Sequence, residues 1–81
     1  MKTNESPEPL LLAILAADGE RIRDFAIRWV KEYTNAGECA LAFDSLAAEI
    51  EDGNYKPSAR AWGLIELAAT ALDLPCPTFK A

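Results

Sequence analysis

The sequence feature that most constrains the fold is a helical spacing of apolar residues, which recurs in four segments of the chain. Apolar residues that follow one another at steps of three and four lie on one face of an α-helix. Ser6 and Ser58 stand directly before the first and fourth segments, where each can cap a helix N-terminus. We therefore expect four helices, at residues 8–17, 20–35, 38–52 and 59–74.

Glycine, asparagine and proline separate the four segments. Glycine commonly ends a helix, and proline cannot continue one because it lacks a backbone N–H. Because the connections are short, consecutive helices should be antiparallel neighbours. The chain is thus predicted to be all-α, a compact antiparallel four-helix bundle that forms a single domain over residues 1–81. The breaks are Asp18-Gly19, Asn35-Ala36-Gly37, Gly53-Asn54 with Pro57, and Pro75 with Pro77.

Composition agrees with an all-α fold. The chain has one valine and five isoleucines, too few β-branched residues for a sheet protein. Alanine and leucine dominate the apolar residues, and both favour helix. With 81 residues, of which 51% are hydrophobic, the chain can form one core but has no room for a deep pocket with a lid.

Charge and residue usage exclude several classes of function. The formal charge of -5, from 13 acidic and 8 basic residues, disfavours binding to nucleic acid, because phosphate backbones repel an acidic surface. The chain contains no histidine, which is the commonest general base and metal ligand. Cys39 and Cys76 lie far apart and form no metal-binding spacing, so zinc is not expected. They could form one disulfide, but reduced thiols are the favoured interpretation. We therefore predict no enzymatic activity, no catalytic residue, no metal and no cofactor.

The most apolar stretch, LLLAILAA at residues 10–17, is too short to span a bilayer. It follows Glu5, Glu8 and two prolines, which do not suit the start of a signal peptide. This stretch is interpreted as a core helix, and the protein is expected to be cytoplasmic, without membrane contact.

Acidic residues gather in and around the third predicted helix. From Glu32 to Tyr55, Glu32 included, there are six acidic residues and no basic one. The predicted apolar stripe of helix 38–52 turns Glu38, Ser45, Glu49 and Asp52 outward. A solvated face that keeps the protein in solution explains such a pattern, and so does a docking surface for a basic protein. The candidate partner-binding residues are Glu38, Asp44, Glu49, Glu51, Asp52 and the loop residue Tyr55.

The aromatic residues are expected to serve mainly in the core. Phe25, Trp29, Tyr33 and Phe43 fit the apolar stripes of their helices. Helix 59–74 is apolar over most of its circumference and should therefore be the most buried helix. Three residues fall off the stripes or at their border and are candidates for half-exposed positions: Ile27, Leu41 and Trp62.

The tripeptide Asp44-Ser45-Leu46 resembles the phosphopantetheine attachment site of acyl and peptidyl carrier proteins. The carrier serine opens a helix after a loop, whereas the stripe through Phe43 and Leu46 places Ser45 in mid-helix on the outward side. A carrier with phosphopantetheine on Ser45 is one alternative function. A generic helical interaction or regulatory module is another.

Two further stretches resemble a known family. They are AGECALAFDSLAAEIED at residues 36–52 and, after a loop with Pro57, LIELAATALDL at residues 64–74. Together they are similar to the small helical immunity proteins of bacterial polymorphic toxin systems, in particular the MafI-type family. The resemblance implies a cytoplasmic, non-catalytic protein that binds a cognate toxin domain, often a nuclease, and neutralises it. A basic nuclease would be attracted to an acidic surface that covers its active site or an adjacent exosite. A monomer is expected, and the resemblance transfers no contact residue.

Overall fold

The computed structural model describes residues 6–79, which form four α-helices. Helix α1 spans Pro7–Asp18, α2 spans Asp24–Asn35, α3 spans Cys39–Glu51 and α4 spans Ala59–Leu72. The prediction of a compact all-α domain with four helices is confirmed. Helix α2 begins four residues later than expected, at Asp24, whereas the other boundaries agree within two residues. Residues 1–5 and 80–81 of the predicted single domain lie outside the described residues.

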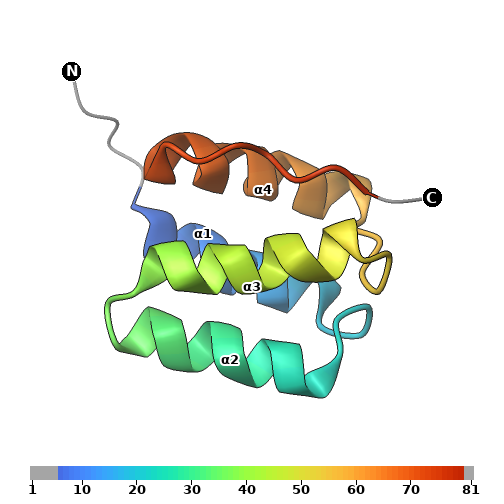
Figure 1. Cartoon of the computed structure of the whole chain (residues 1–81), viewed down its shortest axis with the longest axis horizontal. Helices are drawn as coiled ribbons and strands as arrows, with labels where there is room; N and C mark the ends of the chain where they lie inside the picture. Colours follow the sequence, from blue (N-terminus) through green and yellow to red (C-terminus); the bar gives the residue numbers. More distant parts are fainter. Residues whose placement is uncertain (1–5, 80–81) are drawn as a thin grey trace.

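The helices pack as two antiparallel pairs. Helix α1 packs mainly against α4, and α2 packs mainly against α3, with smaller contacts between the pairs (Figure 1). After α4 the chain runs back along that helix (Figure 1), and Leu74 and Phe79 pack against the core. The C-terminal segment therefore covers part of α4 that the other helices leave open.

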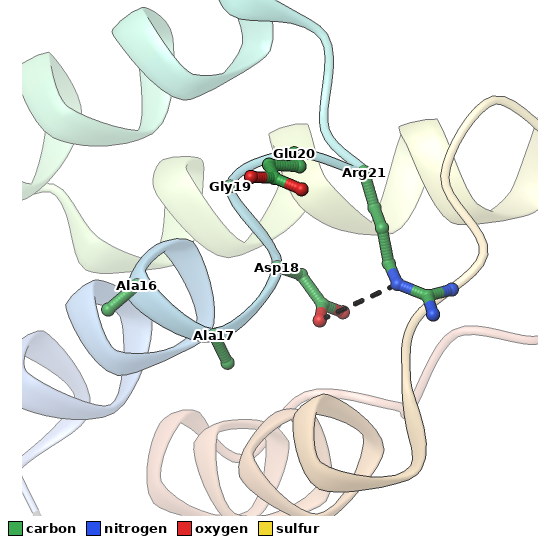
Figure 2. A pocket seen from close by; sticks show the side chains of 6 residues that line it. All are labelled: Ala16, Ala17, Asp18, Gly19, Glu20 and Arg21. Carbon is green, nitrogen blue, oxygen red and sulfur yellow. Dashed lines mark ion pairs between the residues drawn. The ribbon is translucent and has the colours of Figure 1, made fainter.

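Turns and caps set where the helices begin and end. The late start of α2 follows from the turn at residues 18–21, whose course Figure 2 shows. In this turn the backbone N–H of Arg21 donates to the Asp18 carbonyl at 2.8 Å. Ser58 caps α4 by accepting a hydrogen bond from the Ala61 N–H at 3.2 Å. Ser6 occupies the N-cap position of α1, but its side chain makes no capping hydrogen bond. Gly37 follows α2 with a positive φ of 79°, a conformation that glycine adopts without a steric penalty.

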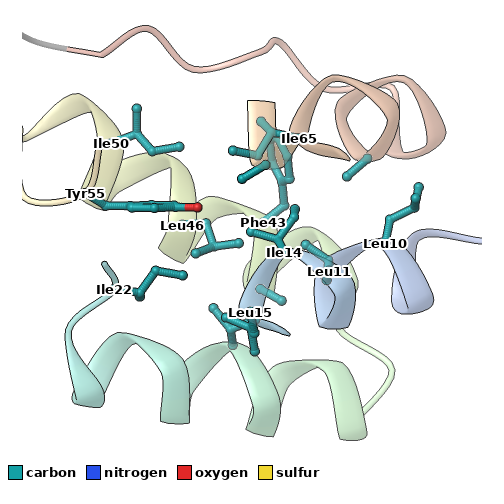
Figure 3. Close-up of a cluster of buried hydrophobic side chains, with 14 of the residues drawn as sticks. Leu10, Leu11, Ile14, Leu15, Ile22, Phe43, Leu46, Ile50, Tyr55 and Ile65 are labelled. Atoms are coloured by element: carbon teal, nitrogen blue, oxygen red, sulfur yellow. The ribbon is translucent and has the colours of Figure 1, made fainter. Parts of the chain in front are cut away.

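The core is a continuous cluster of side chains from all four helices (Figure 3). As predicted, Phe43 is buried in it. Phe25 and Trp29, by contrast, are 50% and 47% exposed, so their prediction as core residues is wrong, and Tyr33 is only half-buried. The buried row of α2 lies one residue further along, which rotates it by about 100° around the helix. It consists of Ile22 before the helix and of Ala26, Val30 and Thr34 within it.

Helix α4 is not the most buried helix, contrary to expectation. Four of its fourteen residues are buried, whereas α1 buries five of twelve. Leu67 on α4 is 47% exposed. Apolar residues all round a helix do not by themselves make that helix buried. Burial depends on where the helix lies in the bundle, and α1 contacts each of the other three helices.

Candidate functional site

Four of the six candidate binding residues form an exposed acidic surface on α3 and at its two caps. Glu38, Asp44, Glu51 and Asp52 are all exposed. Within residues 6–79, none of these four carboxylates lies within ion-pairing distance of an arginine or lysine. We call these four residues the acidic face.

Glu49 does not belong to the acidic face, and its prediction as an exposed contact residue is wrong. It is 7% exposed, and its carboxylate accepts two hydrogen bonds from the Arg23 guanidinium, at 2.9 and 2.7 Å. The hydrogen bond to Glu49 raises the pKa of Arg23. Glu49 was predicted to face solvent, but α2 packs against the side of α3 that carries it. A carboxylate on that side meets a cation from α2 instead of solvent.

Tyr55 is also not a contact residue, because it is fully buried. It projects from the loop after α3 into the core cluster (Figure 3). Its hydroxyl donates a hydrogen bond of 2.7 Å to the Asp18 carboxylate. Burial, followed by this hydrogen bond, raises the pKa of Tyr55 well above its usual range. Its position in a polar loop gave no sign of this role.

Asp18 joins the end of α1 to the start of α4, a role that was not predicted from the sequence. In addition to the Tyr55 bond, its carboxylate accepts hydrogen bonds from the Ser58 N–H at 2.9 Å and the Ser58 hydroxyl at 2.8 Å. Burial alone would raise the pKa of Asp18, but the bonds from Ser58 and Tyr55 and the charge of Arg21 outweigh it, and the pKa is lowered. An acidic residue at a helix C-terminus opposes the helix dipole, which was the one available signal.

A surface hollow of about 400 Å³ lies beside this junction and is lined by residues 16–21 (Figure 2). Its charged residues are Asp18, Glu20 and Arg21, with Arg21 Nε 3.9 Å from the Asp18 carboxylate. Because Asp18 is already engaged by three hydrogen bonds, the hollow is best described as a part of the structural junction. We assign it no chemistry.

A row of aromatic side chains forms the edge of α2 that faces α3. Phe25, Trp29 and Tyr33 follow at steps of four, and the rings of Trp29 and Tyr33 stack with centroids 5.6 Å apart. The Arg23 guanidinium lies 4.6 Å above the centroid of the Phe25 ring while it binds Glu49 of α3. Because the same arginine contacts both Phe25 and Glu49, we place the aromatic row on the side of α2 that borders α3.

Leu41 on α3 and Asp52 at its C-cap lie between the side that borders α2 and the outward side that carries Asp44. Each lies within about 80° of Glu49 around the helix, at about 100° per residue. Leu41 is 44% exposed, and Asp52 is close enough to Arg23 to contribute to raising its pKa. We call the surface formed by Phe25, Trp29, Tyr33 and Leu41 the aromatic face. It adjoins the acidic face.

Ser45 lies in the middle of α3 and is half-buried. A carrier serine must receive a long prosthetic arm at the start of a helix, and this position does not resemble that arrangement. Of the three residues expected to be half-exposed, Ile27 and Trp62 are partly buried and Leu41 is exposed.

No protein-family model matches the chain, and neither the curated proteins nor the solved structures contain a significant match to it. Across residues 6–79, no helix combines the length and the apolar character that crossing a membrane would require. The function must therefore be inferred from the two surfaces described above.

Proposed function

We propose that this protein is a non-catalytic immunity protein that acts in the cytoplasm. It binds a cognate toxin domain of basic character, a nuclease, and occludes its active site or an adjacent exosite. The observation that carries the proposal is the acidic face: four exposed carboxylates on α3 and at its two caps, none of them within ion-pairing distance of an arginine or lysine in the described part of the chain.

Electrostatics makes such a face suitable for this task. A nuclease active site holds phosphate groups and is therefore lined by positive charge. An acidic surface steers toward such a site and accelerates association, more than it strengthens the final complex. Exposed pairs contribute below about 1 kcal/mol to folding, so the stability of this chain does not require these carboxylates.

The corrected position of Glu49 limits the contact surface. Because Arg23 engages Glu49 and Tyr55 is buried, the proposed contacts are Glu38, Asp44, Glu51 and Asp52. The likeness of residues 36–52 and 64–74 to MafI-type immunity proteins also supports the proposal.

The test begins with the protein encoded directly upstream of this chain. Its C-terminal domain is expressed in a bacterial host alone and together with this chain. We expect arrested growth in the first case and restored growth in the second. A harmless upstream product, or growth arrest that this chain does not relieve, would refute the proposal.

Charge reversal then tests the surface itself. The double variant Asp44→Lys/Glu51→Lys should associate with the toxin roughly tenfold more slowly and with a weaker dependence on salt. The control, Glu20→Lys/Glu66→Lys, makes the same change in net charge at exposed positions outside the acidic face. Equal association rates for the two double variants would show that α3 is not the contact surface.

A further inference from the structure

We propose that the aromatic face anchors an amphipathic basic segment of the partner, whose apolar side chains cover Trp29 and Leu41. The arginines or lysines of this segment then meet Glu38 and Asp52 of the acidic face. This inference rests on the proposed function for the identity of the partner, but the chemistry it requires can be tested without the toxin.

The large exposed apolar side chains are concentrated on α2 and the adjoining α3. Single exposed apolar residues are normal on protein surfaces, and they need no explanation. Residues 6–79 contain five large ones, and three of these belong to the aromatic face, on α2 and on the adjoining α3: Phe25, Trp29 and Leu41. The other two, Leu12 and Leu67, lie on α1 and α4.

The aromatic face is already organised without a partner. Trp29 stacks on the half-buried Tyr33, and Phe25 lies under the Arg23 guanidinium that Glu49 holds. Aromatic side chains fixed in this way lose little conformational freedom on binding. Tryptophan, tyrosine and arginine are also the residues that most often dominate binding energy at interfaces.

The charge of the neighbouring acidic face identifies the occupant. With about half of each side chain exposed, Phe25, Trp29 and Leu41 offer on the order of 300 Å² of apolar surface. A stable dimer needs about 800 Å² on each partner, so a second copy would have to use the neighbouring acidic face as well. Two copies, each with a formal charge of -5, also repel each other. A basic segment gains from the carboxylates of the acidic face.

The experiment with the toxin compares three single variants of the full chain. Trp29→Ala and Leu41→Ala should increase the dissociation rate, Trp29→Ala by roughly tenfold or more, because the anchor is lost while the charges remain. Leu67→Ala is the matched control, since Leu67 is exposed to a similar extent, and it should change the rate less than about twofold. Far-UV circular dichroism confirms that each variant is folded.

The second experiment uses a synthetic amphipathic peptide of leucine and arginine, and it does not depend on the toxin. The chain has two tryptophans, so the Trp62→Phe variant reports the fluorescence of Trp29 alone. The peptide should shift the Trp29 emission, and a scrambled peptide of the same composition should bind roughly tenfold more weakly, because its apolar residues do not share a face.

These experiments separate the two proposals. If the upstream protein is not a toxin, the proposed function fails, and the peptide still tests the aromatic face. If the amphipathic and scrambled peptides bind equally, or if Leu41→Ala and Leu67→Ala behave alike toward the toxin, this inference is overturned. Neither result would affect the electrostatic role of Asp44 and Glu51.

Discussion

Replacing Asp18 by asparagine should destabilise the fold more than any other change of a single acidic side chain in the described chain. Asp18 is 3% exposed and accepts three hydrogen bonds, from the Tyr55 hydroxyl and from the N–H and hydroxyl of Ser58. Asparagine has nearly the same volume, so the change removes the charge and part of the accepting capacity without opening a cavity. The junction between α1 and α4 then loses its main polar connection.

The magnitude follows from the bonds that are weakened. A hydrogen bond to a charged group contributes about 1.5 to 3 kcal/mol, and such bonds are not additive within one cluster. The side-chain carbonyl of asparagine can still accept some of these hydrogen bonds. Removing a negative charge from the C-terminus of α1 also stabilises the fold by roughly 0.3 to 1 kcal/mol. We therefore expect the Asp18→Asn substitution to lower the free energy of unfolding by about 2 to 4 kcal/mol relative to the wild type. For a chain of this length, that corresponds to a melting temperature lower by about 10 to 25 °C.

Urea denaturation followed by far-UV circular dichroism measures this difference at pH 7. The control is Asp52→Asn, which changes an exposed carboxylate at the C-terminus of α3 and should alter stability by less than about 0.5 kcal/mol. A loss below about 1 kcal/mol for Asp18→Asn would refute the assigned role, because three charged hydrogen bonds could not then be contributing.

The pH dependence gives an independent check on Asp18. Its pKa in the folded protein lies below the ordinary value of 3.8. The folded state therefore prefers the carboxylate, and this contribution is complete above the unfolded pKa and is lost as the pH falls through the folded pKa. The stability difference between wild type and Asp18→Asn should accordingly be constant from pH 7 to about 5 and shrink below about pH 4. A difference that stays unchanged down to pH 2 would contradict this account.

Three further predictions concern the core and the corrected site residues. Tyr55→Phe removes one hydrogen bond to Asp18 without changing the packing, and urea titration should show a loss of about 1 to 2 kcal/mol. Phe43→Ala should cost about 3 to 5 kcal/mol and Leu67→Ala less than about 0.5 kcal/mol in the same assay, because the first side chain is buried and the second is 47% exposed. Glu49→Lys should lower the melting temperature in differential scanning calorimetry, because it places a second cation against a guanidinium in a largely buried site. An unchanged melting temperature would show that Glu49 faces solvent.

Local chemistry explains why the sequence predicted the helices well. Helix positions depend on apolar spacing and on breaks such as Gly37 and Gly53, which act within a few residues. The buried side of α3 could also be predicted, because Phe43, Leu46 and Ile50 leave only one consistent face. Three of the four helices accordingly begin and end within two residues of the expected positions. The start of α2 was less predictable, because the turn after Asp18 uses residues that also suit a helix.

The sequence did not predict which of two neighbouring rows of α2 enters the core. Phe25 and Trp29 precede Ala26 and Val30 by one residue, so both rows belong to one broad apolar stripe. In the prediction from the sequence, the larger aromatic side chains of Phe25 and Trp29 were favoured as core residues. In the bundle, the smaller Ala26 and Val30 fill the interior, and the aromatic residues are displaced to the edge beside α3. Only the packing of whole helices against one another could decide this.

By itself the sequence determined the all-α class, the four helices, the excess of negative charge and the placement of that charge around α3. The tertiary structure decided which carboxylates remain available to a partner. Asp44 and Glu51 face away from every neighbouring helix, whereas Glu49 meets Arg23 and Asp18 meets Tyr55 and Ser58. The physical reason is that helix periodicity is a property of neighbouring residues, whereas the partner of a charged side chain is supplied by segments 26 to 40 residues away in the chain.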